Sequence, residues 1–321
     1  MLIFLHILGH NIIPVFIIIG LGFLVSKRFN LNIHSLSKLT FYIFVPAFIF
    51  YNLYTAELTF DMLKILFFSV TYMGASFLLA VFISKLRKYD VAMTNAFKNS
   101  IMFNNSGNIG LSLITLIFGS APYVIGGKTP YLNQALTAQV IIMVFMNVTM
   151  NTLGFYNAGR AKMNIRDSMR QILSMPSIYA IILALFLKLI KLDITSSFLW
   201  PTLIYVKEGL VPMALITLGV QLSKTDFHFK DIDVNIAVFT RLVMGPILAF
   251  FLIRLFGFNG VIAQTILISY AVPTAVNTAL IAVECDNRKD FASQEVMIST
   301  IFSAVTLTTV IYGAGILFQI N

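Results

Sequence analysis

The feature that most constrains this chain is a series of apolar runs, each about as long as a membrane is thick. A helix that crosses a bilayer needs about 20 mostly apolar residues, and ten such segments can be placed along the 321 residues. The runs are continuous rather than alternating, which is not the pattern of a transmembrane β-barrel. Charged residues make up only 11% of the chain, whereas soluble domains carry about 25%. The sequence therefore predicts an all-α membrane protein with ten transmembrane helices.

Basic residues in the loops predict how these segments are oriented. The segments are 11–27, 36–56, 63–85, 92–119, 132–157, 177–190, 201–222, 234–256, 261–284 and 291–318. Fourteen Lys and Arg fall in the odd-numbered loops and five in the even-numbered loops. Because cytoplasmic loops are enriched in Lys and Arg, we expect both termini on the outer side of the membrane. The net charge of +9 is then explained without a nucleic-acid partner.

The N-terminal segment and the central connector set the predicted domain organisation. The first 25 residues lack a basic n-region and a cleavage site, so we expect a retained helix rather than a signal peptide. The connector 158–175 is basic, and its apolar residues follow helical spacing, which predicts an amphipathic linker on the inner leaflet. A plain solvated loop is the alternative. The connector separates a first five-helix repeat, 1–157, from a second, 176–321.

An odd number of crossings in each half requires the second half to be inverted. The dipeptide Val45-Pro46 recurs as Val211-Pro212, an offset of 166 residues. The same offset carries Gly107 to Pro273, so the two halves share their helix-breaking positions although few identities remain. The spacing therefore predicts two inverted repeats.

Two polar interruptions lie in corresponding segments of these halves. The fourth segment contains N-N-S-G-N-I-G, Asn104 to Gly110, and the ninth contains Y-A-V-P-T-A-V-N, Tyr270 to Asn277. Gly107 and Pro273 are the predicted helix breaks, because glycine and proline interrupt the helical hydrogen bonds. Matched broken helices in inverted halves indicate the substrate site of a transporter. Close helix packing alone would be an alternative for Gly110 and Ser112.

The breaks also predict the charge that the site prefers. Each opens a half-helix whose N-terminus points to the middle of the membrane, with Asn108 expected to cap one and Pro273 to occupy the first position of the other. Two helix N-termini that approach one centre from opposite sides form an anion site. The sequence therefore predicts a midplane site for a carboxylate or a similar anion.

The two interrupted stretches resemble the auxin efflux carrier family. N-S-G-N-I-G-L-S in the fourth segment and A-V-P-T-A-V-N-T-A-L-I-A in the ninth carry the resemblance, which covers the whole chain. The family includes plant auxin exporters and bacterial malate or malonate permeases. Ser112 departs from it, since the family often has proline there. The short central connector is unlike the long loop of many plant members. It favours a bacterial origin, and hence a location in a bacterial inner (plasma) membrane.

The resemblance implies a fold and a mechanism. It implies the fold of bile-acid symporters and sodium/proton antiporters, with broken crossover helices 4 and 9. Segments 1, 2, 6 and 7 would be a scaffold, and segments 3–5 and 8–10 a mobile transport unit that moves like an elevator in a homodimer. Substrate would bind at the crossing of segments 4 and 9. By position, the substrate residues would be Asn104, Asn105, Asn108, Gly110, Pro273, Thr274 and Asn277.

Ionisable residues inside the segments are candidates for charge pairing or ion coupling. Lys98 lies six residues before Asn104 and could meet an anionic substrate or extend its amine to the inner surface. Glu208 is taken as the one acid clearly inside a segment, either a proton carrier or, as we favour, a structural partner of Lys207 or Arg241 or a group at the outer mouth. The coupling ion is left open between H⁺, Na⁺ and none.

The predicted function is secondary transport of a small organic anion, a carboxylate such as malate. The alternatives are an auxin-like aromatic carboxylate or an amino acid as substrate, or a non-transporting membrane sensor on the same fold. No enzyme, cofactor or metal site is expected: the four histidines lack metal-ligand spacing, and no glycine-rich nucleotide-binding loop with lysine is present.

Overall fold

The chain is helical throughout its described part in the computed structural model. The structure describes Leu5, 7–29, 31–56, 60–159, Leu173, 176–224 and 231–320. The first half contains the π-helix η1 (Leu8–Ile12), α2 (Ile13–Phe29), α3 (Ile33–Leu39), η2 (Thr40–Phe44), α4 (Val45–Thr55), α5 (Phe60–Leu86), α6 (Val91–Met102), η3 (Ser106–Gly110), α7 (Leu111–Phe118), α8 (Leu132–Thr149), η4 (Met150–Gly154) and α9 (Phe155–Asn157).

The second half has a similar succession of long, short and interrupted helices. It contains α11 (Pro176–Leu189), α12 (Leu199–Glu208), α13 (Leu210–Leu222), α14 (Ile232–Phe239), the π-helix η5 (Thr240–Met244), α15 (Gly245–Phe256), α16 (Gly260–Ala271), α17 (Val276–Glu284) and α18 (Lys289–Leu317). The predicted amphipathic linker, 158–175, lies almost wholly outside the described residues.

Seven helices of the described part are long and apolar enough to cross a membrane. The prediction of an all-α protein with several membrane spans is therefore confirmed. The other three of the ten expected segments contain shorter helices. The fourth and ninth are each interrupted in the middle, and α11, in the sixth, has only 14 residues. The inverted repeat itself stays a prediction.

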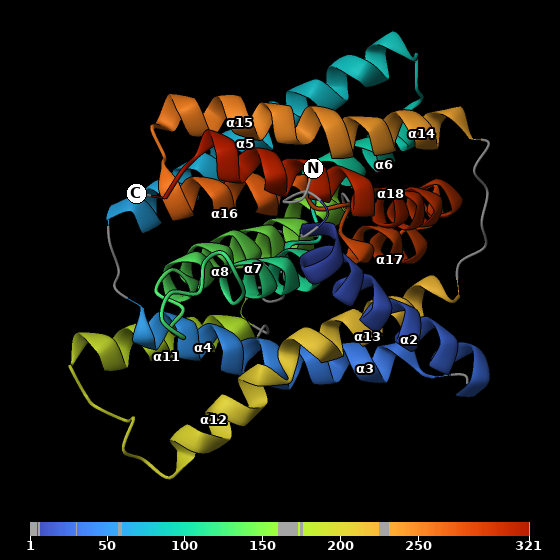
Figure 1. The fold of residues 1–321 in the computed structure, drawn as a ribbon. Helices are drawn as coiled ribbons and strands as arrows, with labels where there is room; N and C mark the ends of the chain where they lie inside the picture. Colours follow the sequence, from blue (N-terminus) through green and yellow to red (C-terminus); the bar gives the residue numbers. More distant parts are fainter. Residues whose placement is uncertain are drawn as a thin grey trace.

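The helices form two outer layers with a third group between them (Figure 1). One layer contains α2, α3, α4, α11, α12 and α13, in which α2 packs on α13 and α4 packs on α11 and α12. The other contains α5, α14, α15, α16 and α18, which contact one another. Helices α7 and α8 lie between the two layers, and α8 contacts α4 on one side and α5 and α16 on the other.

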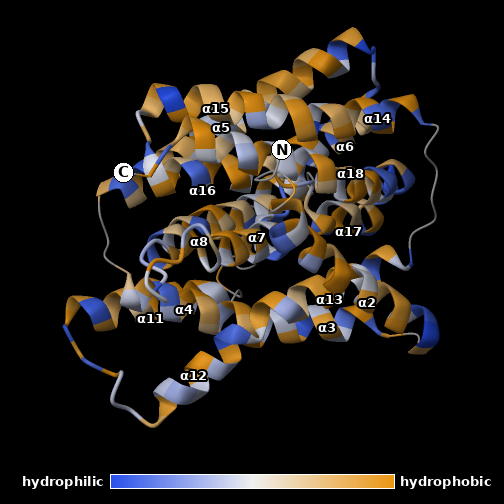
Figure 2. Ribbon diagram, in the orientation of Figure 1, coloured by the Kyte–Doolittle hydropathy of each residue, from blue (hydrophilic) through white to orange (hydrophobic). Residues whose placement is uncertain are grey.

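The outer surface is suited to lipid. Hydrophobic residues cover most of the helical length, and hydrophilic residues gather toward the helix ends (Figure 2). Large side chains such as Phe67, Phe82 and Phe251 are exposed, each by 60% or more. Extended apolar surface of this kind is rare on soluble monomers. It is the surface expected of a protein surrounded by acyl chains.

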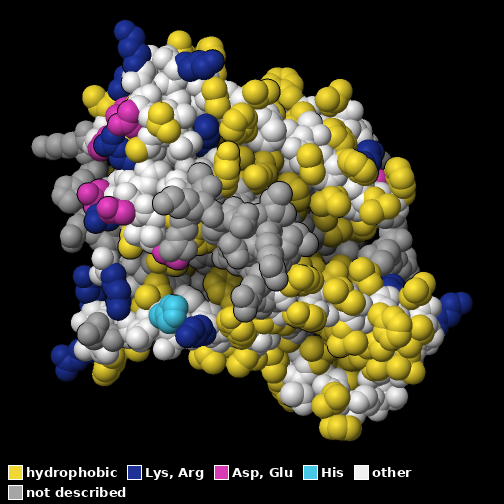
Figure 3. Space-filling model, turned by 180° about the vertical axis from the view of Figure 1, so that it is seen from behind, with side chains coloured by type: hydrophobic (Ala, Val, Ile, Leu, Met, Phe, Trp, Pro, Cys, Tyr) yellow, Lys and Arg dark blue, Asp and Glu magenta, His cyan; other side chains and the backbone are white. Residues whose placement is uncertain are grey.

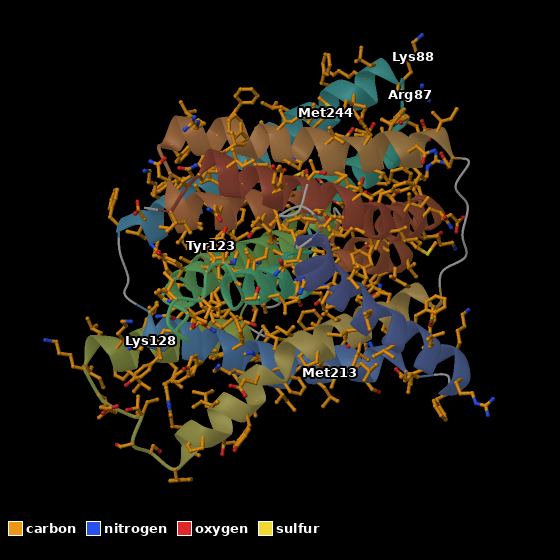
Figure 4. All side chains as sticks on the ribbon, viewed as in Figure 1. Arg87, Lys88, Tyr123, Lys128, Met213 and Met244 are labelled. Atoms are coloured by element: carbon orange, nitrogen blue, oxygen red, sulfur yellow. The ribbon has the colours of Figure 1, made fainter. Side chains whose placement is uncertain are left out.

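Charged side chains gather at one end of the molecule (Figure 3). Arg87 and Lys88 lie at this end and Lys128 lies toward the opposite end (Figure 4). Arg87 and Tyr89 both bond Asp233, at 2.9 and 2.8 Å, and so connect the loop after α5 to the start of α14. Burial raises the pKa of Tyr89 to about 12, so its hydroxyl stays a donor at neutral pH.

Candidate functional site

The two interrupted helices cross as a pair of short extended segments. Between α6 and η3 the chain is extended at Phe103, and between α16 and α17 it is extended at Val272 and Ala275. The segments pair antiparallel through a bridge between Asn104 and Thr274. This pairing supplies partners for backbone groups that would otherwise be unsatisfied in an apolar interior.

The backbone hydrogen bonds of the crossing are reciprocal. The N–H of Asn105 donates to the carbonyl of Pro273 at 2.8 Å, and the N–H of Ala275 donates to the carbonyl of Phe103 at 3.0 Å. Proline explains why the ninth segment opens here, because it lacks an N–H and forces the preceding residue, Val272, out of the helical region. Both predicted interruptions are therefore present, and they contact each other.

The details of the two half-helix starts differ from the sequence prediction. Asn105, not Asn108, caps η3: its Oδ1 accepts from the N–H of Asn108 at 3.3 Å. Gly107 lies inside η3, because the chain already leaves the helix at Phe103 and the asparagine cap restarts it at Ser106. Pro273 lies within the extended segment, three residues before α17 begins, and not at the first helical position.

A buried arginine binds the C-terminal ends of α6 and α16, the helices that precede the two interruptions. Arg241 of η5 is fully buried. Its Nη1 donates to the carbonyl of Ile101 at 2.8 Å, near the end of α6. Its Nη2 and Nε donate to the carbonyls of Tyr270 and Val272, at 2.5 and 3.1 Å, at the end of α16. One guanidinium therefore satisfies carbonyls left open at two helix C-termini.

A buried glutamine joins the crossing to the middle helices. Gln139 of α8 donates from Nε2 to the carbonyl of Ser106 at 2.7 Å and accepts from the hydroxyl of Ser269. Asn104 donates from Nδ2 to the carbonyl of Ser269 at 3.1 Å. A Cβ at Gly110 would lie 2.9 Å from Gln139 Nε2. Gly110 is thus needed for close approach of Gln139, and it does not line the pocket described next.

A small pocket lies on one side of the crossing, at the boundary between two groups of helices. Its volume is about 40 Å³, room for roughly three waters. None of the described side chains that line it is charged. The lining comprises Phe41, Val45, Asn104, Asn105, Ser106, Gly107, Asn108, Met143, Asn147, Met150, Ala275, Val276 and Asn277. The first residues of η3 and of α17 are among them, so two helix N-termini meet the same space.

The structure places the predicted site residues in two groups. Asn104, Asn105, Asn108 and Asn277 line the pocket, whereas Gly110, Pro273 and Thr274 do not. The Oδ1 of Asn104 and the Nδ2 of Asn105 are buried and have no hydrogen-bond partner in the described part of the chain. Asn147 of α8 also lines the pocket. Sequence reasoning missed it, because α8 carries no helix break and a single asparagine gives no signal.

The ionisable candidates lie away from the pocket. Glu208 is exposed, with its Oε1 3.8 Å from Lys207 Nζ, while Lys207 lies over the ring of Tyr51. Lys98 donates to Asn95 Oδ1 at 3.1 Å and lies over the ring of Phe77.

The statement that Glu208 is the one acid inside a segment is wrong. Glu295 of α18 is fully buried, and its Oε1 lies 2.7 Å from the hydroxyl oxygen of Thr274. The sequence contains a signal for Glu295, because it is a lone acid beside serines and threonines within the last apolar segment.

Comparisons with known proteins identify a family of transport proteins. A family model described as membrane transport protein matches residues 7–311. A relative named "Uncharacterized transporter" from Methanothermobacter thermautotrophicus is 22% identical over 307 residues, 92% of this chain and 95% of that one. A protein of Rhizobium meliloti named "Putative malonate transporter" is 27% identical over 109 residues, 34% of each chain. The chain is thus a transport protein, not an enzyme, and it belongs to the membrane transport protein family, the auxin efflux carrier family.

Proposed function

We propose that the protein is a secondary transporter of a small organic anion, a carboxylate such as malate or malonate, and that it binds this anion at the helix crossing. The observation that carries the proposal is the pocket where two half-helices begin and five asparagines meet, with no charged side chain among the described residues that line it. The malonate named for one relative belongs to the same class of anions.

Neutral donors and helix ends can hold a carboxylate without a cation. The first-turn N–H groups of a helix have no acceptor in their own helix, and the N-terminus carries about half a positive charge. Val276 and Asn277 are the first residues of α17, and both line the pocket. The side-chain amides of Asn108 and Asn277 make no hydrogen bond to a described residue. We assign them as donors to the carboxylate oxygens.

Transport requires the pocket to widen. A volume of 40 Å³ does not admit a dicarboxylate, so the pocket is too small for the substrate in the described conformation. Phe41 and Val45 line it from the layer that contains α2 and α13. Four of the asparagines line it from the crossing, and Asn147 lines it from α8. We propose that this layer is the scaffold and that the crossing moves along it with the other helices. The elevator mechanism and the homodimer implied by the family resemblance are kept as parts of this proposal.

Removal of either pocket amide is expected to impair transport. Asn108→Ala and Asn277→Ala should each lower the initial rate of radiolabelled malonate or malate uptake into proteoliposomes by roughly 10- to 100-fold. A hydrogen bond to a charged group contributes about 1.5–3 kcal/mol. Both side chains are only partly buried and make no hydrogen bond to a described residue, so expression and folding should remain near wild type.

Asn133→Ala is the matched control. Asn133 lies at the exposed start of α8, away from the pocket, and the same change there should leave uptake unchanged. Wild-type rates in both pocket variants would remove the site assignment. If the folded wild-type protein carries neither malonate nor malate, the substrate proposal is wrong, and other anions can be screened by their effect on thermal stability.

A further inference from the structure

Glu295 is a buried acid beside the crossing that the proposed substrate site does not use. It lies on α18 with no exposed surface. Its Oε1 lies 2.7 Å from the hydroxyl oxygen of Thr274, and its Oε2 has no hydrogen-bond partner among the described residues. Among the described residues, no Lys, Arg or His nitrogen lies within 4 Å of this carboxyl group. An ionised carboxylate in such surroundings is costly, because burial removes its water without supplying a partner.

The hydrogen bonds of Thr274 indicate where a proton resides. Its Oγ1 lies 2.8 Å from the carbonyl oxygen of Ser100 and 2.7 Å from Glu295 Oε1. The carbonyl and an ionised carboxylate are both acceptors, but the hydroxyl has one hydrogen. Both contacts are satisfied when Glu295 is protonated on Oε1. The carboxylic acid then donates to Thr274, and Thr274 donates to Ser100.

The titratable groups on the elements that surround Glu295 are compatible with its protonation. On the elements packed against α18 they are His10, Lys98, Asp233, Arg241, Tyr270 and Glu284. Lys98 contacts Asn95 and the Phe77 ring, and His10, Asp233 and Glu284 lie near helix ends. Tyr270 is buried and neutral in its ordinary form.

Arg241 is a fully buried cation on η5, which packs against α18. Its guanidinium donates to three carbonyls at the ends of α6 and α16. Those helix ends carry negative partial charge, so much of the charge on Arg241 is already balanced without Glu295.

The extended segment connects Glu295 to the pocket. Thr274 and Ala275 are consecutive in the extended segment, where successive side chains point to opposite faces. Thr274 contacts Glu295, and Ala275 lines the pocket. Only the extended segment would therefore separate a negative charge on Glu295 from the bound anion. The charge would repel the anion, because the protein interior has a low dielectric constant. Protonation of Glu295 removes this repulsion and favours the anion.

We propose that Glu295 is the proton-binding site of an anion–proton symporter. The proposal rests on the proposed function, and it identifies the coupling ion as H⁺. On the side of higher proton concentration, an O–H bond forms between Glu295 Oε1 and a proton from water. The neutral side chain then crosses with the substrate. On the other side the O–H bond breaks, and the proton returns to water.

The protonation state can be measured without substrate. Infrared spectroscopy of the wild-type protein in lipid at neutral pH should show the carbonyl-stretch band of a buried carboxylic acid. Glu295→Gln should lose this band, and Asp290→Asn, which makes the same change at an exposed position of α18, should keep it. A wild-type spectrum without the band, or a Glu295→Gln spectrum that keeps it, overturns the proton assignment.

Coupling is tested by transport with imposed gradients. Acid outside and alkaline inside should accelerate malonate uptake by the wild type and by Asp290→Asn. Glu295→Gln mimics the protonated acid, so it should exchange labelled for unlabelled malonate across the membrane but lose all response to the proton gradient. A wild-type response retained by Glu295→Gln overturns the proposal, as does wild-type uptake driven by a sodium gradient instead.

The two assays separate the failure of each proposal. If the wild type does not transport malonate or malate, the substrate proposal fails, while the infrared band still decides whether Glu295 is protonated.

Discussion

Arg241→Met is expected to destabilise the protein more than any other single side-chain truncation at the crossing. The substitution leaves the carbonyls of Ile101, Tyr270 and Val272 without their donor. Each unsatisfied buried group costs about 1–3 kcal/mol, which gives a loss of roughly 3–9 kcal/mol. The apparent melting temperature in detergent should fall by roughly 10 °C or more, with a loss of monodisperse protein in size-exclusion chromatography.

Arg254→Met is the control for the loss of a guanidinium from the same span. Arg254 is exposed near the end of α15, over the rings of Phe250 and Phe318, and its truncation should change the melting temperature by a few degrees at most. Arg241→Lys should be intermediate, because one ammonium cannot reproduce the planar donors that reach three carbonyls. A melting temperature of Arg241→Met equal to wild type would contradict the described hydrogen bonds.

The role of Arg241 follows from the electrostatics of two broken helices. Each break creates a positive N-terminus and a negative C-terminus near the middle of the span. The N-termini of η3 and α17 meet the pocket, and the C-termini of α6 and α16 meet Arg241. A fixed positive charge therefore stabilises the negative ends permanently, whereas the positive ends are left for a ligand. This asymmetry favours an anionic substrate over a cationic one.

The crossing could be predicted from the sequence because its causes are local. Proline and glycine within apolar runs, with asparagines beside them, predict interrupted helices wherever they occur. The two interruptions also contact each other, through the bridge between Asn104 and Thr274. The capping residue was misassigned by three positions, from Asn105 to Asn108, because several asparagines in a row satisfy the same local rule.

The partners of the buried charges could not be predicted, because they depend on tertiary contacts. Arg241 was visible as a basic residue inside a span, but its carbonyl acceptors lie 29 to 140 residues away in the chain. Gln139 is similar, since it meets Ser106 and Ser269 only after the two halves pack together. Glu295 could have been found, because any acid within an apolar segment indicates function by default.

Gly219→Ala is expected to disrupt the packing of α2 against α13. An ideal Cβ at Gly219 would lie 1.9 Å from the carbonyl oxygen of Ile19 and 2.8 Å from the backbone nitrogen of Phe23. These atoms belong to the backbone of α2 and cannot move aside as a side chain could, so the two helices must separate. Such overpacking costs about 3 kcal/mol or more, and the apparent melting temperature should fall by roughly 6–12 °C. Gly22→Ala should behave alike, since its Cβ would meet the backbone of Ile216.

Gly20→Ala separates this steric effect from a general effect of alanine in a helix. Gly20 lies on the same helix as Gly22, two residues earlier. Apart from its chain neighbours and the backbone of its own helix, no atom of a described residue lies within 4 Å of the position of its Cβ. Alanine there should stabilise α2 by up to about 1 kcal/mol. If Gly219→Ala and Gly20→Ala melt at the same temperature, α2 and α13 do not pack as closely as described. The layer that contains them would then lack the rigid contact that a scaffold needs, and the proposed movement of the crossing along it would lose its structural basis.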